Sequence, residues 1–314
     1  MALFSYGTLI MIDDYQGLGL SDSDIETLKK HGLSNLLDKI KEQHHQLEQQ
    51  KEKLQTALSK IEKDLAVARD AQMSLLPKDL IGIPNIEFSA RFYPSEYVSG
   101  DIYNIFRLDE THFGVYHIDV SGHGVPAALF SVSLSQMLNT NVSKRNILKV
   151  PVTEPPFYKI NPPDKVIALL DEDRSFERYG LYFTMIYMIV DTQERTIQFT
   201  RAGHNYPIVL RADKSIEIHK AGSIPLGWDL PRYDEVVTLK MNKGDRVFLY
   251  SDGIHEATNP KRKMFTLKRL TDSLANSSKL SLDQSLDQLI VELRNFIGSN
   301  NFEDDVSILG LSWK

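Results

Sequence analysis

The chain has 314 residues, of which 42% are hydrophobic and 25% charged, so it is long enough to bury a sizeable core in one large domain or two smaller ones. Its formal net charge of −6 offers no basic face for nucleic acid, and the absence of cysteine excludes disulfides, zinc–thiolate sites and a cysteine nucleophile. Since no apolar run reaches the roughly 18 residues of a membrane span, we expect a cytoplasmic protein without such a span.

The first 32 residues form a short N-terminal segment whose role the sequence leaves open. It begins MALFSYGTLIMIDD, which is apolar but short. A signal peptide has basic residues before its apolar stretch, and this segment has none there. The segment is therefore interpreted as a small strand, a docking segment or the remnant of a longer upstream module.

Residues 33–76 lack glycine and proline and carry a repeat with alternating steps of three and four residues. Its members are Leu37, Ile40, His44, Leu47, Lys51, Leu54, Leu58, Ile61, Leu65, Ala68, Gln72 and Leu75. Such a 3.5-residue period is typical of a left-handed coiled coil. Because the polar His44 and Lys51 stand at core positions, where such residues fix register, we expect a parallel homodimer. The alternative is a long amphipathic helix packed on its own domain.

Beyond Pro77, which ends this helix, residues 78–314 change to short strand-like runs. Strands are predicted within 86–94, 102–108, 113–120, 182–190, 196–202, 207–212, 215–220, 236–240, 246–252 and 306–313. Helical patterns occupy 125–139 and 164–172, with more between 265 and 298. The proline-rich residues 141–163 are predicted as a long surface loop. Many hairpin-linked strands with segregated helices indicate an α+β layered sandwich.

Aspartates stand at the ends of four predicted strands. Asp119 is the last residue but one of FGVYHIDV, and Asp252 follows RVFLYS; each stands before a glycine-containing turn. Asp304 and Asp305 precede the last strand, and Asp101 follows a glycine at the start of another. A single aspartate at such a point is more often a turn residue. Four converging carboxylates, however, would repel one another unless cations lay between them.

The chemistry of these side chains indicates which cations would fit. No lysine or arginine accompanies the aspartate motifs, and neither cysteine nor clustered histidine is available as a ligand. An oxygen-only ligand set suits hard ions such as Mg²⁺ or Mn²⁺. The sequence therefore predicts a metal site wherever these strand ends meet.

Six short motifs in one order resemble a known family. They are GD at 100–101, DVSGHG at 119–124, FTMIY at 183–187, AGHNYP at 202–207, SDGIHEA at 251–257 and DDVSIL at 304–309. Together they resemble the metal-dependent Ser/Thr protein phosphatases of the PPM type, in the bacterial SpoIIE-like branch. ARDAQMSLLP at 68–77 is similar to the linker that precedes these domains in stress-response regulators.

The resemblance implies an antiparallel β-sandwich flanked by helices, here preceded by the long coiled-coil helix, with two ions, Mg²⁺ or Mn²⁺, at one edge. By motif, Asp119 would bridge both ions. Asp101 and the backbone carbonyl of Val120 would hold one ion, and Asp252 and Asp304 would hold the other. Asp119 and Asp101 are the expected catalytic residues. Two such ions can share a water, lower its pKa and present hydroxide to phosphorus.

Several residues depart from this pattern or fit other patterns. The family often has a second acid in GDxxD, where this chain has the uncharged Asn104. The GHG at 122–124 lacks the GK[ST] of a phosphate-binding loop, and Ser121 is not in a G-x-S-x-G elbow. His123 is expected to line the metal site or to fill a turn. His204 is predicted to be structural, with its imidazole satisfied by backbone groups.

The resemblance further implies a substrate and a signalling context. The expected reaction is dephosphorylation of phosphoserine or phosphothreonine on a protein, namely an anti-sigma-factor antagonist of the STAS type in a bacterial partner-switching pathway. The coiled coil would dimerise the enzyme and carry a signal from an upstream sensor or activator. The alternative, suggested only by Asn104, is a catalytically weak scaffold or binding module of the same pathway.

Overall fold

The computed structural model describes residues 21–32, 34–77, 82–83, 85–143, 146–172, 180–228 and 230–314. The apolar segment predicted at the start of the chain lies within residues 1–20, outside the described residues. The chain divides into two compact units, Met1–Leu65 and Ala66–Lys314, so the second unit begins inside the long helix.

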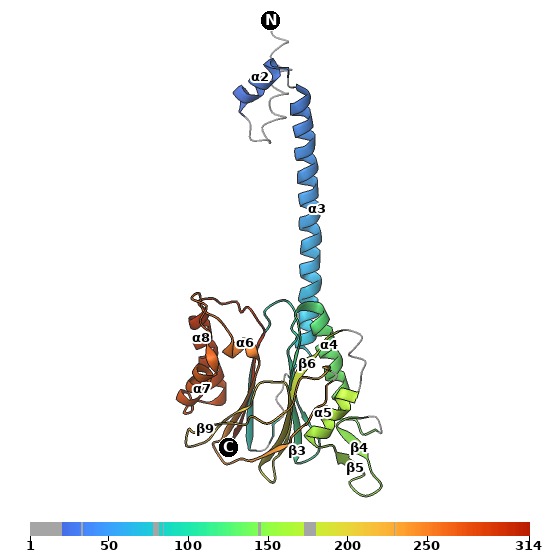
Figure 1. Ribbon diagram of the computed structural model, residues 1–314, viewed down its shortest axis with the longest axis vertical. Helices are drawn as coiled ribbons and strands as arrows, with labels where there is room; N and C mark the ends of the chain where they lie inside the picture. The colour runs from blue at the N-terminus through green and yellow to red at the C-terminus, as the bar shows by residue number, and fades with distance from the viewer. Residues whose placement is uncertain are drawn as a thin grey trace. The chain divides into compact units, whose positions relative to one another are not determined.

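The long helix predicted before the sandwich is present as α3, Ser34–Met73, and a short helix α2, Asp22–Lys30, precedes it in the chain (Figure 1). α3 ends at Met73 because Pro77 has no N–H to donate to the carbonyl of Met73, as a continuing helix would require. Its last turn is closed by hydrogen bonds from the backbone nitrogens of Ser74 and Leu75. Apolar members of the heptad repeat are exposed along it, including Leu47 at 60% and Leu54 at 71%.

The second unit contains two five-stranded sheets in which every pair of neighbouring strands is antiparallel. The first sheet has the order β1 (Ile86–Tyr93), β12 (Val306–Trp313), β11 (Arg246–Tyr250), β8 (Ile208–Leu210) and β9 (Ile216–Ile218). The second has the order β10 (Val237–Lys240), β7 (Thr196–Ala202), β6 (Phe183–Asp191), β3 (His112–Val120) and β2 (Ile102–Arg107). Each predicted strand is present, which confirms the α+β class.

Helices cover the outer faces of both sheets (Figure 1). On the second sheet, α4 (Gly124–Met137) packs against β2 and β3, and α5 (Pro163–Glu172) packs against β6 and β7. On the first sheet, α8 (Leu282–Ile297) packs against β1 and β12, and α7 (Thr266–Asn276) packs against β8. The four-residue helix α6 (Asp252–His255) follows β11 directly. The predicted sandwich flanked by helices is therefore confirmed.

The strand sequences explain how the layers stack. Successive side chains of a strand point to opposite faces. In β11, Val247 and Leu249 join the core between the two sheets, whereas Phe248 and Tyr250 join the core beneath α7 and α8. A shift by one residue would exchange these faces, so the apolar pattern fixes the register. That register determines where the strands end, and hence where the aspartates lie.

The prediction of a long loop over 141–163 is wrong in part. Two three-residue strands, β4 (Lys149–Pro151) and β5 (Tyr158–Ile160), form a small antiparallel sheet there. Side chains provide backbone hydrogen bonds that such short strands do not form with each other. Asn146 accepts from two backbone N–H groups, and Asn161 donates to the carbonyl of Ile147. Strands this short carry too little alternation to be recognised among prolines.

Candidate metal centre

The strand pairing brings the aspartates together in two pairs of segments. In the second sheet, β2 begins where β3 ends, since Ile102 pairs with Ile118, and this places Asp101 near Asp119. In the first sheet, β12 begins where β11 ends, since Tyr250 pairs with Ile308. The segment after β11 carries Asp252, and the segment before β12 carries Asp304. Each sheet therefore contributes two of the predicted ligands.

The carboxyl groups of these two pairs are close enough for their charges to affect one another's pKa. Burial raises the pKa of Asp119, and the charges of Asp252 and Asp304 raise it further. Burial likewise raises the pKa of Asp101 well above its usual range, and the charges of Asp119, Asp305 and Asp252 raise it further. Partial burial also raises the pKa of Asp252 and of the more exposed Asp304. The site is thus a region of poorly compensated negative charge.

Asp101 is the most deeply buried of these carboxyl groups, with 2% of its surface exposed. Its backbone nitrogen donates to Ser99 Oγ at 3.0 Å, and its Oδ2 accepts from Ser307 Oγ at 2.5 Å. The hydrogen bond from Ser307 lowers the pKa of Asp101 and so opposes the effect of burial. Ser307 therefore holds the side chain of Asp101, while Ser99 holds its backbone.

Asp305 has a different role from its neighbour Asp304. Its Oδ1 accepts from the backbone nitrogen and the hydroxyl of Ser95, at 2.8 and 2.9 Å. Its Oδ2 accepts from Ser99 Oγ at 2.5 Å and from the backbone nitrogen of Gly100 at 3.0 Å. These bonds hold the loop that leads to Asp101 against the first sheet.

Two glycines permit the close backbone contacts at the site, as expected from their position beside the aspartates. A Cβ on Gly100 would lie 2.8 Å from the carbonyl oxygen of Val120, and one on Gly253 would overlap the carbonyl oxygen of Asp305. Contacts below 3.0 Å to backbone atoms cannot be relieved by turning a side chain. Gly100 therefore lets the loop before β2 approach the carbonyl that was predicted to be a ligand.

The donor set fits hard divalent cations by charge and atom type, since it consists of carboxylates and a backbone carbonyl. Among the described residues, however, no group of three acidic or histidine side chains already has the spacing of a metal cage. The raised pKa values and the missing cage are compatible. Charges shift one another's pKa over several ångströms, whereas ligands must come within about 2–3 Å of an ion. The carboxylates are near one another without forming a closed cage.

The histidines predicted near the site have well-defined partners. His123 precedes α4 and its Nδ1 lies 2.9 Å from a carboxylate oxygen of Glu96, with both side chains largely exposed. The charge of His123 lowers the pKa of Asp304, which places this ring close to the carboxylates. His204 is not satisfied by backbone groups as predicted, because its ring contacts the side chains of His117 and Thr184. His117 lies within the strand motif FGVYHIDV, and no sequence feature singled it out.

The comparisons with known proteins agree with this geometry. Residues 109–314, more than half of the chain, match the family model described as Stage II sporulation protein E (SpoIIE).

The chain belongs to the SpoIIE family.

The motif resemblance is thereby confirmed, and relatives of this SpoIIE-family chain can be named. It is 26% identical over 203 residues to phosphoserine phosphatase RsbP of Bacillus subtilis (strain 168), covering 62% of this chain and 46% of RsbP. It therefore spans less than half the length of that relative.

Solved structures share the fold of this SpoIIE-family chain. The SiaA-PP2C domain of Pseudomonas aeruginosa matches with a TM-score of 0.70 at 18% identity, over 82% of this chain and 99% of that domain. RsbX in complex with magnesium matches with a TM-score of 0.50 at 13% identity, over 74% of this chain and 97% of RsbX. Within the described residues, no helix is both long and apolar enough to cross a membrane.

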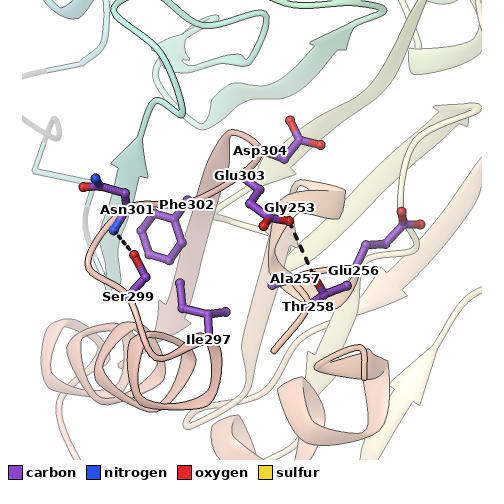
Figure 2. Close-up of a pocket in the computed structure, with 10 residues that line it drawn as sticks. All are labelled: Gly253, Glu256, Ala257, Thr258, Ile297, Ser299, Asn301, Phe302, Glu303 and Asp304. Atoms are coloured by element: carbon purple, nitrogen blue, oxygen red, sulfur yellow. Dashed lines mark hydrogen bonds between the residues drawn. The ribbon is translucent and has the colours of Figure 1, made fainter. Parts of the chain in front are cut away.

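A pocket of about 520 Å³ adjoins the carboxylates of this SpoIIE-family chain (Figure 2). Gly253 and Asp304 reach it from the site, and Phe302 and Ile297 supply apolar surface. Glu303 turns toward Thr258, whose hydroxyl donates to it at 3.4 Å. Three of the residues that line the pocket are acidic, namely Glu256, Glu303 and Asp304.

Asn104, the departure from the family motif, does not face the aspartates. Its Oδ1 accepts from the backbone nitrogen of Ile105 at 2.8 Å. It also forms a hydrogen bond with Tyr116 that lowers the pKa of that phenol, although burial has the larger and opposite effect. The Tyr116 hydroxyl donates in turn to Ser135 on α4. Asn104 thus links β2 to β3 and α4.

Proposed function

We propose that this protein hydrolyses phosphoserine or phosphothreonine on a protein substrate, with the help of Mg²⁺ or Mn²⁺. The observation that carries the proposal is the meeting of four aspartates from four chain segments, whose charges raise one another's pKa. Membership of the SpoIIE family, the name of the relative RsbP and the magnesium in RsbX support it.

The proposal assigns two ions to the site. Asp119 would contribute to both ions, Asp101 and the carbonyl of Val120 would hold one, and Asp252 and Asp304 would hold the other. Because no closed cage is present among the described residues, binding would require these side chains to move closer together. Bound ions of this kind supply a water of lowered pKa and neutralise charge on the phosphoryl oxygens. The ions would favour the ionised form of these carboxyl groups, which burial and mutual repulsion disfavour, and the chain holds the groups near one another.

A direct test measures hydrolysis of a phosphoserine peptide and of a small aryl phosphate in the presence of Mn²⁺. Asp119→Asn keeps the size of the side chain but removes its charge, and we expect a loss of at least about 100-fold in kcat/KM, because metal-supplied stabilisation is worth several kcal/mol. Asp213→Asn, at an exposed turn, serves as the matched control and retains wild-type rates. Equal rates for wild type and Asp119→Asn would favour the scaffold alternative.

The partners belong to the same proposal. The substrate is a phosphorylated STAS-type antagonist, and an upstream sensor or activator acts through the helix α3 of a homodimer in the cytoplasm. Exposed heptad residues such as Leu54, Leu58 and Ile61 support pairing of α3 with a second copy, because they form an uncovered apolar stripe.

A contact within the second unit supports signal transfer from the end of α3. The side chain of Gln72 is buried, and its amide nitrogen donates to the carbonyl of Ser99 at 2.6 Å and to Ser131 Oγ on α4 at 3.3 Å. Its Oε1 accepts from the backbone nitrogen of Ser99 at 3.0 Å. Ser99 also contacts Asp305 and Asp101. A rotation of the helix end would thus move both α4 and the loop that carries Asp101.

Deletion of residues 1–65 tests this coupling. We expect a dimeric full-length protein and a monomeric truncated protein with altered specific activity. Sedimentation gives the oligomeric state, and phosphopeptide hydrolysis gives the activity. If both quantities are unchanged by the deletion, the proposed role of the helix is refuted, while the proposed phosphatase activity stands.

A further inference from the structure

A buried row of polar side chains crosses the space between the two sheets and ends at Asp101. Ser307 Oγ on β12 lies 2.5 Å from Asp101 Oδ2 and 2.8 Å from His117 Nε2 on β3. His117 Nδ1 lies 2.8 Å from His204 Nε2, and His204 Nδ1 lies 2.9 Å from Thr184 Oγ1 on β6. The exposed fractions of His117, His204 and Ser307 are 0%, 3% and 0%. We call these five residues the buried polar row.

A carboxylate that binds a metal ion is ionised, and in that state Asp101 fixes the direction of every hydrogen bond in the row. A carboxylate can only accept, so Ser307 donates its proton to Asp101. The Ser307 oxygen then accepts from Nε2–H of His117, whose Nδ1 is left as an acceptor. His204 donates its own Nε2–H to that Nδ1, and Thr184 donates to Nδ1 of His204. Both rings are then neutral with the proton on Nε2, in agreement with burial, which lowers the pKa of His117 to about 3.

We propose that His117 and His204 are positioning residues for the metal ligand Asp101, and that they act through Ser307. Because Ser307 occupies Oδ2, the row orients the carboxylate so that Oδ1 serves the ion. The inference rests on the proposed function and adds to it residues that do not themselves touch an ion. Outer hydrogen-bond partners of this kind commonly change metal affinity or activity by about 10–100-fold when they are removed.

The buried polar row does more than pair its own donors and acceptors. Burying two imidazoles and a hydroxyl between sheets is less favourable than apolar packing unless each polar atom is paired. Here each ring nitrogen has one partner, and with Asp101 ionised every donor in the row points toward that carboxylate. Because every hydrogen bond in the row depends on the next, the position of each ring affects how the carboxylate of Asp101 is oriented.

The test measures Mn²⁺ binding to the full-length protein by isothermal titration calorimetry. His204→Leu removes the ring furthest from the ligand, and we expect Kd for Mn²⁺ to rise about tenfold or more. His204→Gln retains an amide N–H that can donate to His117, and we expect its Kd to stay within about threefold of wild type, because the donor is restored. Ser285→Ala is the matched control, because it breaks an equally buried hydrogen bond to Ser277 in another part of the unit.

The outcomes separate the possibilities. Wild-type Kd in a folded His204→Leu variant overturns the inference, as does an equal rise of Kd in Ser285→Ala, which would indicate general loosening. If His204→Leu does not fold, Ser307→Ala is measured instead, with the same expected rise. A wild-type protein that binds Mn²⁺ but hydrolyses no phosphopeptide refutes the proposed function and leaves this inference standing. Failure of the wild type to bind Mn²⁺ refutes both.

Discussion

Replacement of Asp305 by asparagine should loosen the loop that carries Asp101. In the wild type, each carboxylate oxygen of Asp305 accepts two hydrogen bonds from residues 95–100. Asparagine keeps one oxygen but replaces the other with an amide group that donates. In either orientation, one backbone N–H of the loop, at Ser95 or Gly100, loses its acceptor and faces a donor.

The cost follows from these contacts. A buried donor without an acceptor costs about 1–3 kcal/mol, and the bonds that remain lose the charge that strengthens them. We therefore expect Asp305→Asn to lower the free energy of unfolding by about 2–4 kcal/mol. Since the loop leads into Asp101, Mn²⁺ affinity should fall as well.

Urea denaturation followed by circular dichroism measures the first effect, and calorimetry measures the second. Asp213→Asn is the control, because Asp213 also accepts from the backbone nitrogen and hydroxyl of a serine, but at an exposed turn. Its urea midpoint should match the wild type. An Asp305→Asn protein that also unfolds at the wild-type midpoint would show that the loop does not depend on this carboxylate.

Three further predictions concern other parts of the second unit. Gly253→Ala should lower the free energy of unfolding by about 1–3 kcal/mol in urea denaturation, because the new Cβ would overlap backbone atoms of Asp305. Gly82→Ala is the control, because its Cβ would meet open space, and equal urea midpoints for the two variants would contradict the prediction. Gln72→Leu should make phosphatase activity insensitive to removal of residues 1–65, and a variant that still responds would show that coupling runs elsewhere. The two buried imidazoles have lowered pKa, so the unfolded chain takes up protons first and stability should fall as pH drops from about 6.5 toward 3. Urea midpoints between pH 7 and 5 should fall less steeply for His204→Gln, and parallel curves would count against this explanation.

The strands and the acidic strand ends could be predicted because both are local patterns. FGVYHIDV and RVFLYSD show a buried strand and its terminal aspartate within eight residues or fewer. Which strands pair was not predicted, and it is the observed antiparallel pairing of β2 with β3 that places Asp101 near Asp119. Short-range patterns of this kind determine which element forms and where it ends.

The buried polar row and the role of Asp305 could not be predicted, because their partners are distant in sequence. His117 lies 87 residues from His204 and 190 from Ser307, and Asp305 lies 206 residues from Ser99. No local spacing relates these positions. For the same reason the partners of His204 were assigned to the backbone, although side chains from two other strands reach its ring.

The division of the four aspartates between the two sheets has a thermodynamic consequence. Two ions that share Asp119, one bound also by Asp101 from the second sheet and the other by Asp252 and Asp304 from the first, would link the two sheets. Separation of the two sheets would then require release of the ions, so the free energy of ion binding would add to the free energy needed to separate them. The relation is reciprocal. A change that moves the two sheets slightly apart, even at the far end of a strand, would lower the affinity for the ions.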